Sequence, residues 1–315
     1  MRILRRESNG TANNFPGANI LMNNTFICVG VSPCFDATLV LDALEPDKVS
    51  RVSKELREAA GVALNVAREL KRQGKRSVVT GLLNEDGSDE YGKALDESGI
   101  RHDFVFVPGR VRVNITLLVG HDTYKVNRRS VCPTDAAGRL RMKLLDWSTK
   151  NSVFIFGGAT PDGMSPEQYA DLMMTARKTG SRVAVDTDVL SYEQIREVRP
   201  WLYKPNAREL SQLFGIEDPD DDALIEAAHR LNADGVEIVL LTLGSRGLYA
   251  VTAEETVFAE AVPVDCKNTV GAGDAALAGF LAAWDSGLSL KECASRAAES
   301  GAAAAAGTGT APGAE

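Results

Sequence analysis

The sequence is poor in the residues that form metal centres and disulfide frameworks. It has only three histidines in 315 residues, and they lie far apart, which argues against a structural zinc site. Cysteine is scarce, odd in number and without metal-ligand spacing, so we expect reduced thiols, as in a cytoplasmic protein. The five cysteines are Cys28, Cys34, Cys132, Cys266 and Cys293.

Long apolar runs and an excess of positive charge are missing as well. No apolar stretch approaches the roughly 20 residues that a membrane-spanning helix requires, so we expect no membrane partner. The net charge of −8 and the pI of about 5.1 argue against nucleic acid as a partner. Residues 1–24 lack the apolar core of a signal peptide and are interpreted as a flexible N-terminal extension, and residues 311–315 as a flexible tail.

What the sequence does contain is an ordinary globular composition and a regular order of elements. Hydrophobic residues make up 44% and charged residues 25%, which is enough for a large core. Apolar runs typical of buried strands, such as residues 26–31 and 77–83, alternate with helical patterns such as residues 61–73. This alternation predicts an α/β fold with a mostly parallel central sheet and helices on both faces.

Two segments break this rhythm. Residues 37–58 and 103–130 contain stretches that alternate with period two, and Pro108-Gly109 separates two of them, which predicts a β-hairpin. We expect these segments to form a small sheet that projects over the main domain as a lid. The α/β core is then predicted to comprise residues 25–36, 59–102 and 131–310.

Residues 268–274, with the sequence NTVGAGD, have the pattern of a tight glycine loop that runs into an apolar helix. The small residues Gly271, Ala272 and Gly273 let backbone N–H groups approach an anion, and the helix N-terminus adds partial positive charge. The carboxylate of Asp274 would repel an anion but suits a general base that takes a proton from a hydroxyl, which suggests phosphoryl transfer to an alcohol. The alternative is a helix with Asp274 as its N-cap, and the loop by itself favours neither.

Other polar residues have both a functional and a structural interpretation. Asp36 follows the first predicted strand, where open α/β sheets bind ligands, but it also fits a simple turn. Asn65 lies on an otherwise apolar helix turn, where core helices often tolerate one such residue. Arg112 and Asn114 share one face of a strand by alternation, and a solvated strand face is the alternative.

Asn206 and Glu209 lie three residues apart at a predicted helix start, so both can face one point. Oxygen ligands at this spacing suit Mg²⁺ held mainly through water. A capping box, with Asn206 as N-cap and Glu209 at the third helical position, fits the same residues equally well.

Together these motifs closely resemble those of the phosphofructokinase-B (pfkB), or ribokinase-like, carbohydrate kinases. The family's C-terminal signature matches residues 268–280, its Lys-Pro-Asn-x-x-Glu-Leu matches residues 204–210 completely, and its Arg-x-Asn matches residues 112–114. Gly61 and Asn65 match the family's Gly-Gly-Lys-Gly-x-Asn-Val-Ala, and Asp36 matches the Asp of its Asn-Pro-Ala-x-Asp. Residues 238–247 resemble the strand and glycine turn beside the nucleotide phosphates. The resemblance covers about residues 25–310, with its motifs in the expected order.

The resemblance implies a ribokinase-like fold and ATP-dependent phosphorylation of a sugar or sugar-phosphate hydroxyl with Mg²⁺. A homodimer through the lid is implied by analogy alone. The implied catalytic residues are the base Asp274 and an anion hole formed by Gly271, Ala272 and Gly273. The implied sugar-binding residues are Asp36, Gly61, Asn65, Arg112 and Asn114. The implied nucleotide-binding residues are Lys204, Asn206, Thr242, Gly244 and Gly247, and the implied metal residues, acting through water, are Asn206 and Glu209.

The chain departs from the family pattern at several positions, among them Lys125, where an acidic residue is expected. Val62 replaces the lysine that helps to hold an existing phosphate, and Ser32 replaces an asparagine. Other details resemble most the 1-phosphofructokinases and tagatose-6-phosphate kinases, whereas Val62 points to an unphosphorylated sugar or a nucleoside, as in fructokinases and ribokinases. Lys125, Arg128 and Arg129 could supply the cation that Val62 lacks, or could form a plain surface cluster. A non-catalytic relative that binds a sugar or nucleotide is a further alternative.

Overall fold

A computed structural model of the protein describes residues 24–267 and 269–307. The predicted tail and all but the last residue of the predicted N-terminal extension lie outside these residues. Asn24 is buried, and both its backbone N–H and its side-chain amide donate to Asp285, so this residue belongs to the core.

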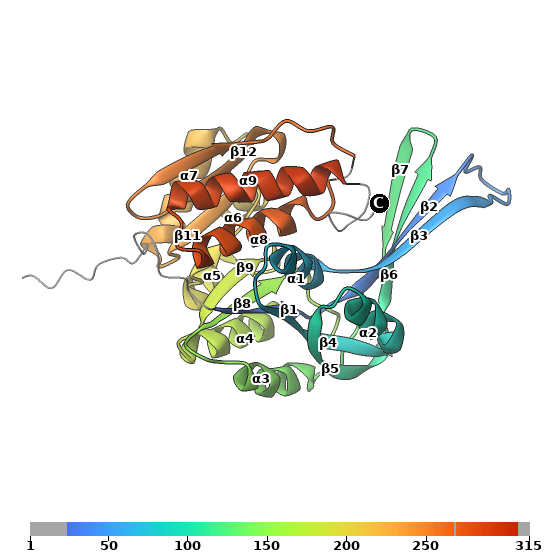
Figure 1. Ribbon diagram of the computed structural model, residues 1–315, viewed down its shortest axis with the longest axis horizontal. Helices are drawn as coiled ribbons and strands as arrows, with labels where there is room; N and C mark the ends of the chain where they lie inside the picture. The colour runs from blue at the N-terminus through green and yellow to red at the C-terminus, as the bar shows by residue number, and fades with distance from the viewer. Residues whose placement is uncertain (1–23, 268, 308–315) are drawn as a thin grey trace, which may run out of the picture.

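Within these residues, most of the chain forms a nine-stranded sheet with helices on both faces (Figure 1). The strand order is β13-β12-β11-β10-β9-β8-β1-β4-β5; neighbours from β11 to β5 are parallel, and β12 and β13 add an antiparallel edge. The predicted fold class is confirmed. The strands are β1 Thr25–Gly30, β4 Ser77–Asp86, β5 Arg101–Arg110, β8 Ser152–Gly157, β9 Arg182–Asp186, β10 Leu202–Tyr203, β11 Ile238–Thr242, β12 Gly247–Val251 and β13 Thr256–Glu260.

One face of the sheet is covered by α1, α2, α8 and α9, and the other by α3 to α7. None of the helices within the described residues has the length and apolar character needed to cross a bilayer. The helices are α1 Val62–Arg72, α2 Ser88–Glu97, α3 Ala136–Asp146, α4 Pro166–Lys178, α5 Tyr192–Val198, α6 Ala207–Phe214, α7 Asp221–Ala233, α8 Ala272–Asp285 and α9 Leu290–Ala306.

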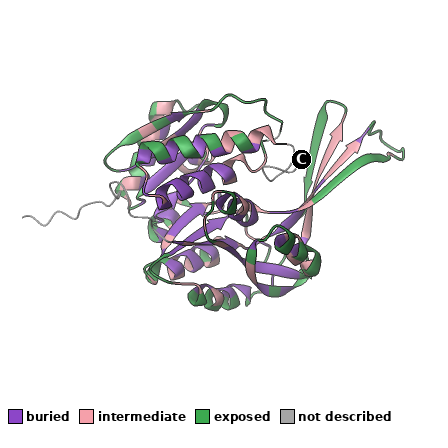
Figure 2. Ribbon diagram, in the orientation of Figure 1, coloured by how far each residue is buried: buried purple, intermediate pink, exposed green. Residues whose placement is uncertain are grey.

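The first strand shows why the sheet is buried on both faces. Phe26 and Cys28 belong to one apolar cluster and Ile27 and Val29 to the other, and all four side chains are fully buried. A strand that is apolar on both sides is typical of a parallel sheet between two helix layers. Figure 2 shows the same layering, with buried strands and helices that are exposed on their outer sides. The carboxyl ends of the parallel strands therefore meet at one edge, where such sheets bind ligands.

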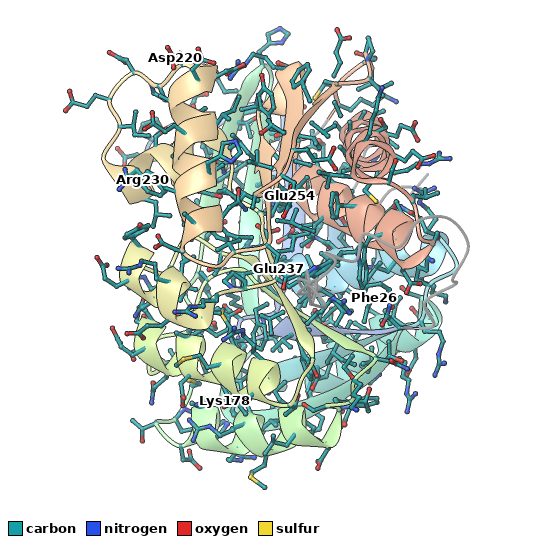
Figure 3. All side chains as sticks on the ribbon, turned by 90° about the vertical axis from the view of Figure 1, so that its left-hand side faces the viewer. Phe26, Lys178, Asp220, Arg230, Glu237 and Glu254 are labelled. Atoms are coloured by element: carbon teal, nitrogen blue, oxygen red, sulfur yellow. The ribbon has the colours of Figure 1, made fainter. Side chains whose placement is uncertain are left out.

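The helix ends follow local sequence signals, as α7 illustrates. The Asp220 side chain accepts a hydrogen bond from the backbone N–H of Ala223 at 2.8 Å, and Arg230 lies in the last turn, where its charge complements the helix dipole. Figure 3 shows Asp220 and Arg230 toward opposite ends of this helix.

A second, four-stranded sheet, which we call the lid, projects from the core (Figure 1). Its order is β3-β2-β6-β7, with β2 and β6 parallel and the outer pairs antiparallel. The register of the central pair places Asp36 directly opposite Asn114. The lid strands are β2 Cys34–Leu41, β3 Val52–Ala60, β6 Arg112–Val119 and β7 Asp122–Asn127.

The hairpin predicted around Pro108-Gly109 is wrong. β5, which contains both residues, is the edge strand of the main sheet and runs parallel to β4, whereas β6 belongs to the lid. The break between the two strands is Val111, whose backbone N–H donates to Asp86. The placement of Asp36 also needs correction, because the first strand ends at Gly30 and Asp36 lies inside β2 of the lid.

Candidate active site

A cavity of about 190 Å³ lies where the lid meets the carboxyl ends of the core strands. The lid contributes Asp36, Arg112 and Asn114, and the starts of α1 and α8 contribute Gly61, Asn65 and Asp274. The predicted anion-hole residues 271–273 are not among the residues that line it. All five predicted sugar-binding residues and the predicted base line this one cavity: Asp36, Gly61, Asn65, Arg112, Asn114 and Asp274.

The glycine loop holds Asp274 in the first turn of α8. The N-cap of this helix is Gly271, whose φ of 79° is the left-handed conformation that favours glycine. Ala272 and Gly273 are the first two helical residues and Asp274 is the third. The alternative with Asp274 as N-cap is therefore wrong, and its carboxylate is free to face the cavity.

Asp274 is half-buried among groups of both signs. The side-chain amide of Asn65 donates to Oδ2 of Asp274 at 2.8 Å across 209 residues of sequence. Burial and the nearby carboxylate of Asp186 raise the pKa of Asp274 to about 7, although Asn65 and Lys204 act in the opposite direction. A carboxylate with this pKa is well matched to general-base work near neutral pH.

Lys204 and Asp186 form a buried ion pair behind the glycine loop. The Lys204 ammonium lies 2.9 Å from Asp186 Oδ1, and a Cβ placed on Gly273 would lie 3.3 Å from that ammonium. Burial lowers the pKa of Lys204, but Asp186, Asp274 and Glu209 outweigh it and the pKa is raised. A permanent cation therefore lies beside the predicted anion hole. Sequence reasoning gave Asp186 no role, although its position at the end of a buried parallel strand was a usable signal.

On the lid side, the side-chain amide of Asn114 connects the polar residues of the cavity. Its Nδ2 donates to Asp36 Oδ1 at 2.9 Å and to the Cys34 sulfur at 3.3 Å, and its Oδ1 accepts from Arg112 at 3.1 Å. Burial raises the pKa of the Cys34 thiol to about 12, so this cysteine stays neutral. The set forms a fixed row of donors and acceptors suited to hydroxyl groups.

Arg112 also fixes the turn between β1 and β2. Its Nε and Nη2 both donate to the carbonyl of Ser32, at 3.2 and 3.1 Å, and Nη1 donates to the carbonyl of Arg128. The hydroxyls of Ser32 and Ser130 lie 2.5 Å apart. These contacts connect three segments, namely the turn between β1 and β2, the lid, and the chain segment that follows β7.

Val62 forms an apolar part of the cavity wall. A Cβ placed on Gly157 would lie only 2.3 Å from Cγ1 of Val62, so the side chain packs tightly on the turn that follows β8. Lys125, Arg128 and Arg129 do not line the cavity, although the Arg128 backbone is fixed at its edge by Arg112.

The predicted nucleotide residues lie at the ends of β10 and β11, outside the cavity. Asn206 forms a bridge with Thr242, whose backbone N–H donates to Pro205. Gly244 begins a short 3₁₀ turn, Gly244–Arg246, and Gly247 begins β12. Lys204 is the member of this group that comes close to the glycine loop.

The capping box at the start of α6 is formed. Asn206 Oδ1 accepts from the Glu209 backbone N–H at 2.9 Å, and Glu209 Oε2 accepts from the Asn206 backbone N–H at 3.0 Å. Among the described residues, no group of three or more His, Cys, Asp or Glu is placed to bind a metal directly. The pair fits a metal only through water.

Fold and site together define an α/β kinase with a β-sheet lid over a cavity that contains a half-buried aspartate at a glycine-rich helix start. The sequence matches the pfkB family of carbohydrate kinases over residues 25–315, and the chain belongs to this family. It is a sugar kinase, a phosphotransferase that acts on an alcohol group.

Three relatives illustrate the similarity. The chain is 31% identical to 1-phosphofructokinase of Escherichia coli (strain K12) over 263 residues, 82% of this chain and 84% of the relative. It is 33% identical to 1-phosphofructokinase of Haloferax volcanii over 268 residues, 84% and 85% of the two chains. The crystal structure of phosphofructokinase-2 from Escherichia coli in complex with potassium has a TM-score of 0.84 at 23% identity, covering 92% of this chain and 94% of the other, which shows a common fold.

Proposed function

We propose that this kinase transfers the γ-phosphoryl group of ATP to a hydroxyl of a ketohexose phosphate, as 1-phosphofructokinases or tagatose-6-phosphate kinases do. The observation that carries the proposal is the single cavity in which Asp274 meets the hydroxyl-binding row of Asp36 and Asn114. Asp274 takes the proton of the acceptor hydroxyl, whose oxygen attacks the γ-phosphorus; the bond from this phosphorus to the β,γ-bridging oxygen breaks, and ADP leaves. The backbone N–H groups of residues 271–273, the α8 N-terminus and the Lys204 ammonium stabilise the negative charge that develops.

The phosphate already on the substrate is proposed to bind at the lid edge of the cavity. Four of the five N–H groups of Arg112 are engaged by Ser32, Asn114 and Arg128, which leaves one N–H and the full positive charge. Arg128 is exposed at the same edge and supplies a second cation. Two guanidinium groups suit a phosphate dianion, which requires charge-assisted hydrogen bonds.

The second candidate is a kinase for an unphosphorylated sugar or nucleoside, and the position of Val62 favours it. This side chain lies where a family lysine would face the cavity, and its contact with Gly157 makes that wall apolar. An apolar wall cannot bind a phosphate. If the substrate is unphosphorylated, the cations at the lid edge bind no substrate phosphate.

ATP and Mg²⁺ are proposed to bind at the ends of β10 and β11. Lys204, Asn206, Thr242, Gly244 and Gly247 would surround the phosphates of the nucleotide. Asn206 and Glu209 would hold Mg²⁺ through water. When bound, the metal would neutralise charge on the β- and γ-phosphates.

The deciding experiment is a panel of free sugars, nucleosides and sugar phosphates, scored for ADP release with ATP and Mg²⁺. We expect turnover of a ketohexose phosphate, with kcat/KM lowered about ten- to a hundredfold in Arg128→Ala, the loss typical of a charge-assisted contact. Arg129→Ala is the matched control, because its guanidinium is directed to Asp162 instead. Efficient turnover of a free sugar or nucleoside, without activity on any phosphosugar, would replace the first candidate by the second.

A homodimer through the lid is proposed as well. Along β7, Tyr124 and Val126 are 47% and 54% exposed, and they lie opposite Leu117 and Ile115 of β6. By alternation these side chains point away from the face that contains Asn114. An apolar sheet face left in water is typical of an interface between copies.

A further inference from the structure

Helix α2 of the core lies against the root of the lid (Figure 1). Phe35 of β2 belongs to the lid face turned away from the cavity, because the next residue, Asp36, lines the cavity. The Phe35 ring is buried and meets Tyr91 of α2 edge to face, with ring centroids 5.7 Å apart. The Tyr91 hydroxyl donates to the carbonyl of Ala60, the last residue of β3, at 3.0 Å. Two lid strands are thus attached to this one helix.

Arg57 of β3 adds an ion pair to this attachment. Its Nε and Nη2 donate to the two carboxylate oxygens of Glu90 on α2, each at 3.0 Å. The same guanidinium lies over the Phe35 ring, 4.3 Å from its centroid. Arg57 is therefore joined to the core by charge and to the neighbouring lid strand by a cation–π contact. The bidentate geometry fixes the direction of the ion pair as well as its length.

The strand register relates this ion pair to the hydroxyl-binding row. Arg57 lies opposite Ala37 of β2. The residue before Ala37 is Asp36, which lies opposite Asn114. In the present lid arrangement Asp36 and Asn114 line the same cavity as Asp274 of the core. A tilt of the lid about its root would move the row away from Asp274, and a contact between β3 and α2 opposes that tilt.

We propose that Arg57 and Glu90 form a clamp that sets the angle of the lid, and that both are positioning residues for binding of the acceptor. The proposal rests on the proposed function, because it takes the row of Asp36 and Asn114 to bind acceptor hydroxyls. Neither clamp side chain is among the described residues that line the cavity, so each acts through the lid.

The exposure of the clamp defines the size of its effect. The side chains of Arg57 and Glu90 are 38% and 56% exposed, so their ion pair is weak and is screened by salt. A weak contact at the root of a lid can still shift the population of lid angles. The apparent affinity for the acceptor then falls with the fraction of molecules in the competent arrangement.

The test is a double-mutant cycle on KM and kcat with the best acceptor of the panel. Arg57→Gln and Glu90→Gln should each raise the acceptor KM about two- to fivefold and leave kcat in place, because bound acceptor restores the lid angle. The double variant should be no weaker than Arg57→Gln, because the ion pair is already broken. At high salt the difference in KM between wild type and the variants should shrink.

A charge swap separates pairing from lost packing. Arg57→Glu places two carboxylates side by side and should raise KM further, and adding Glu90→Arg should reverse most of that increase. Glu97→Gln is the matched control, because Glu97 is an exposed carboxylate of α2 that pairs with Lys93 of the same helix. It should leave KM unchanged. A swap as weak as Arg57→Glu alone overturns the clamp, and a lower kcat with an unchanged KM overturns the positioning role.

The clamp and the proposed function can fail separately. If an acceptor is turned over and both Gln variants have the wild-type KM, the clamp alone is overturned. If wild type phosphorylates no acceptor, the proposed function fails, and hydrogen exchange tests the clamp without substrate. The backbone amides of β2 and β3 should then exchange about two- to fivefold faster in Arg57→Gln and Glu90→Gln than in wild type or Glu97→Gln, with no change in the core strand β8. Equal exchange in all four proteins overturns the clamp.

Discussion

Asp274, the proposed general base, lies in an environment that is unfavourable for its charge. Its half-buried carboxylate lies near Asp186 and Asp36, and one amide and one ammonium only partly compensate. Strain of this kind at a single residue is typical of sites that are built for chemistry, because a fully solvated carboxylate would be a weaker base. Two predictions follow from this one side chain.

Replacing Asp274 with Asn removes the proton acceptor and keeps the shape. We expect kcat to fall about 10²–10⁴-fold, the usual contribution of a general base, with little change in sugar affinity. The same variant should melt at a higher temperature than wild type above neutral pH, because the buried charge is gone. Asp285→Asn is the control: this buried aspartate of the same helix is paired with Lys75 at 2.8 Å, so its loss should lower the melting temperature. Turnover of Asp274→Asn close to wild type would refute the assignment.

The pH dependence has a definite sign. The pKa of Asp274 rises from 3.8 to about 7 on folding, so the native state binds more protons than the unfolded state between these values. The stabilisation is complete below the unfolded pKa and is lost as pH rises through the folded pKa. Activity runs the opposite way and should fall as pH drops below about 7, because the base must be ionised. Melting curves of wild type and Asp274→Asn from about pH 5 to about pH 9 should converge on the acid side and diverge on the alkaline side.

At the scale of elements, the start of α6 shows one pair of side chains with two possible tasks. The capping box between Asn206 and Glu209 is present, yet it does not exclude a role for Glu209 in holding Mg²⁺ through water. Glutamine preserves the cap and removes the charge, which makes the two tasks separable.

We expect Glu209→Gln to raise the Mg²⁺ concentration needed for half-maximal activity and to change stability by no more than ~1 kcal/mol. The chain offers a matched control in α9, where Ser289 and Glu292 form another capping box with a glutamate at the third helical position. Glu292→Gln should have the same small effect on melting and none on the Mg²⁺ titration. Identical Mg²⁺ curves for wild type and Glu209→Gln would leave only the capping role.

The elements themselves were largely predictable from sequence. Apolar runs and helical periodicity predict the parallel core, because a strand that is apolar on both faces must be covered by other elements on both sides. The failed hairpin at Pro108-Gly109 shows the limit of this reasoning. β5 is an edge strand of the core and β6 is central in the lid, and period-two alternation is the same for both. Which sheet a strand joins is decided by long-range pairing, here between β4 and β5 and between β2 and β6.

The site shows the same limit. Its residues could be located from motif resemblance, whereas their contacts could not. The bond between Asn65 and Asp274 spans 209 positions, and the ion pair between Lys204 and Asp186 joins two neighbouring strands. The sequence also left open whether Asp274 is the N-cap of its helix. The structure decides against it, because the N-cap of α8 is Gly271.

At the scale of the whole molecule, the lid presents an apolar face that the core does not cover. We expect a dimer at micromolar concentration, and Val126→Glu should convert it to monomer, because a charge on that face cannot be buried without a partner. Met142→Glu is the control: Met142 is 64% exposed on α3, away from the lid. Sedimentation of the three proteins measures the outcome, and a monomeric wild type would contradict the proposal.

The contact between Val62 and Gly157 also constrains the order in which this protein could change over evolutionary time. With a β-branched side chain at position 62, any residue other than glycine at position 157 would place its Cβ 2.3 Å from Cγ1 of Val62. The two positions are therefore epistatic: a substitution at 157 must wait for a change at 62. A change at position 62 can come first, because position 157 is still glycine, so only one order of the two substitutions is open.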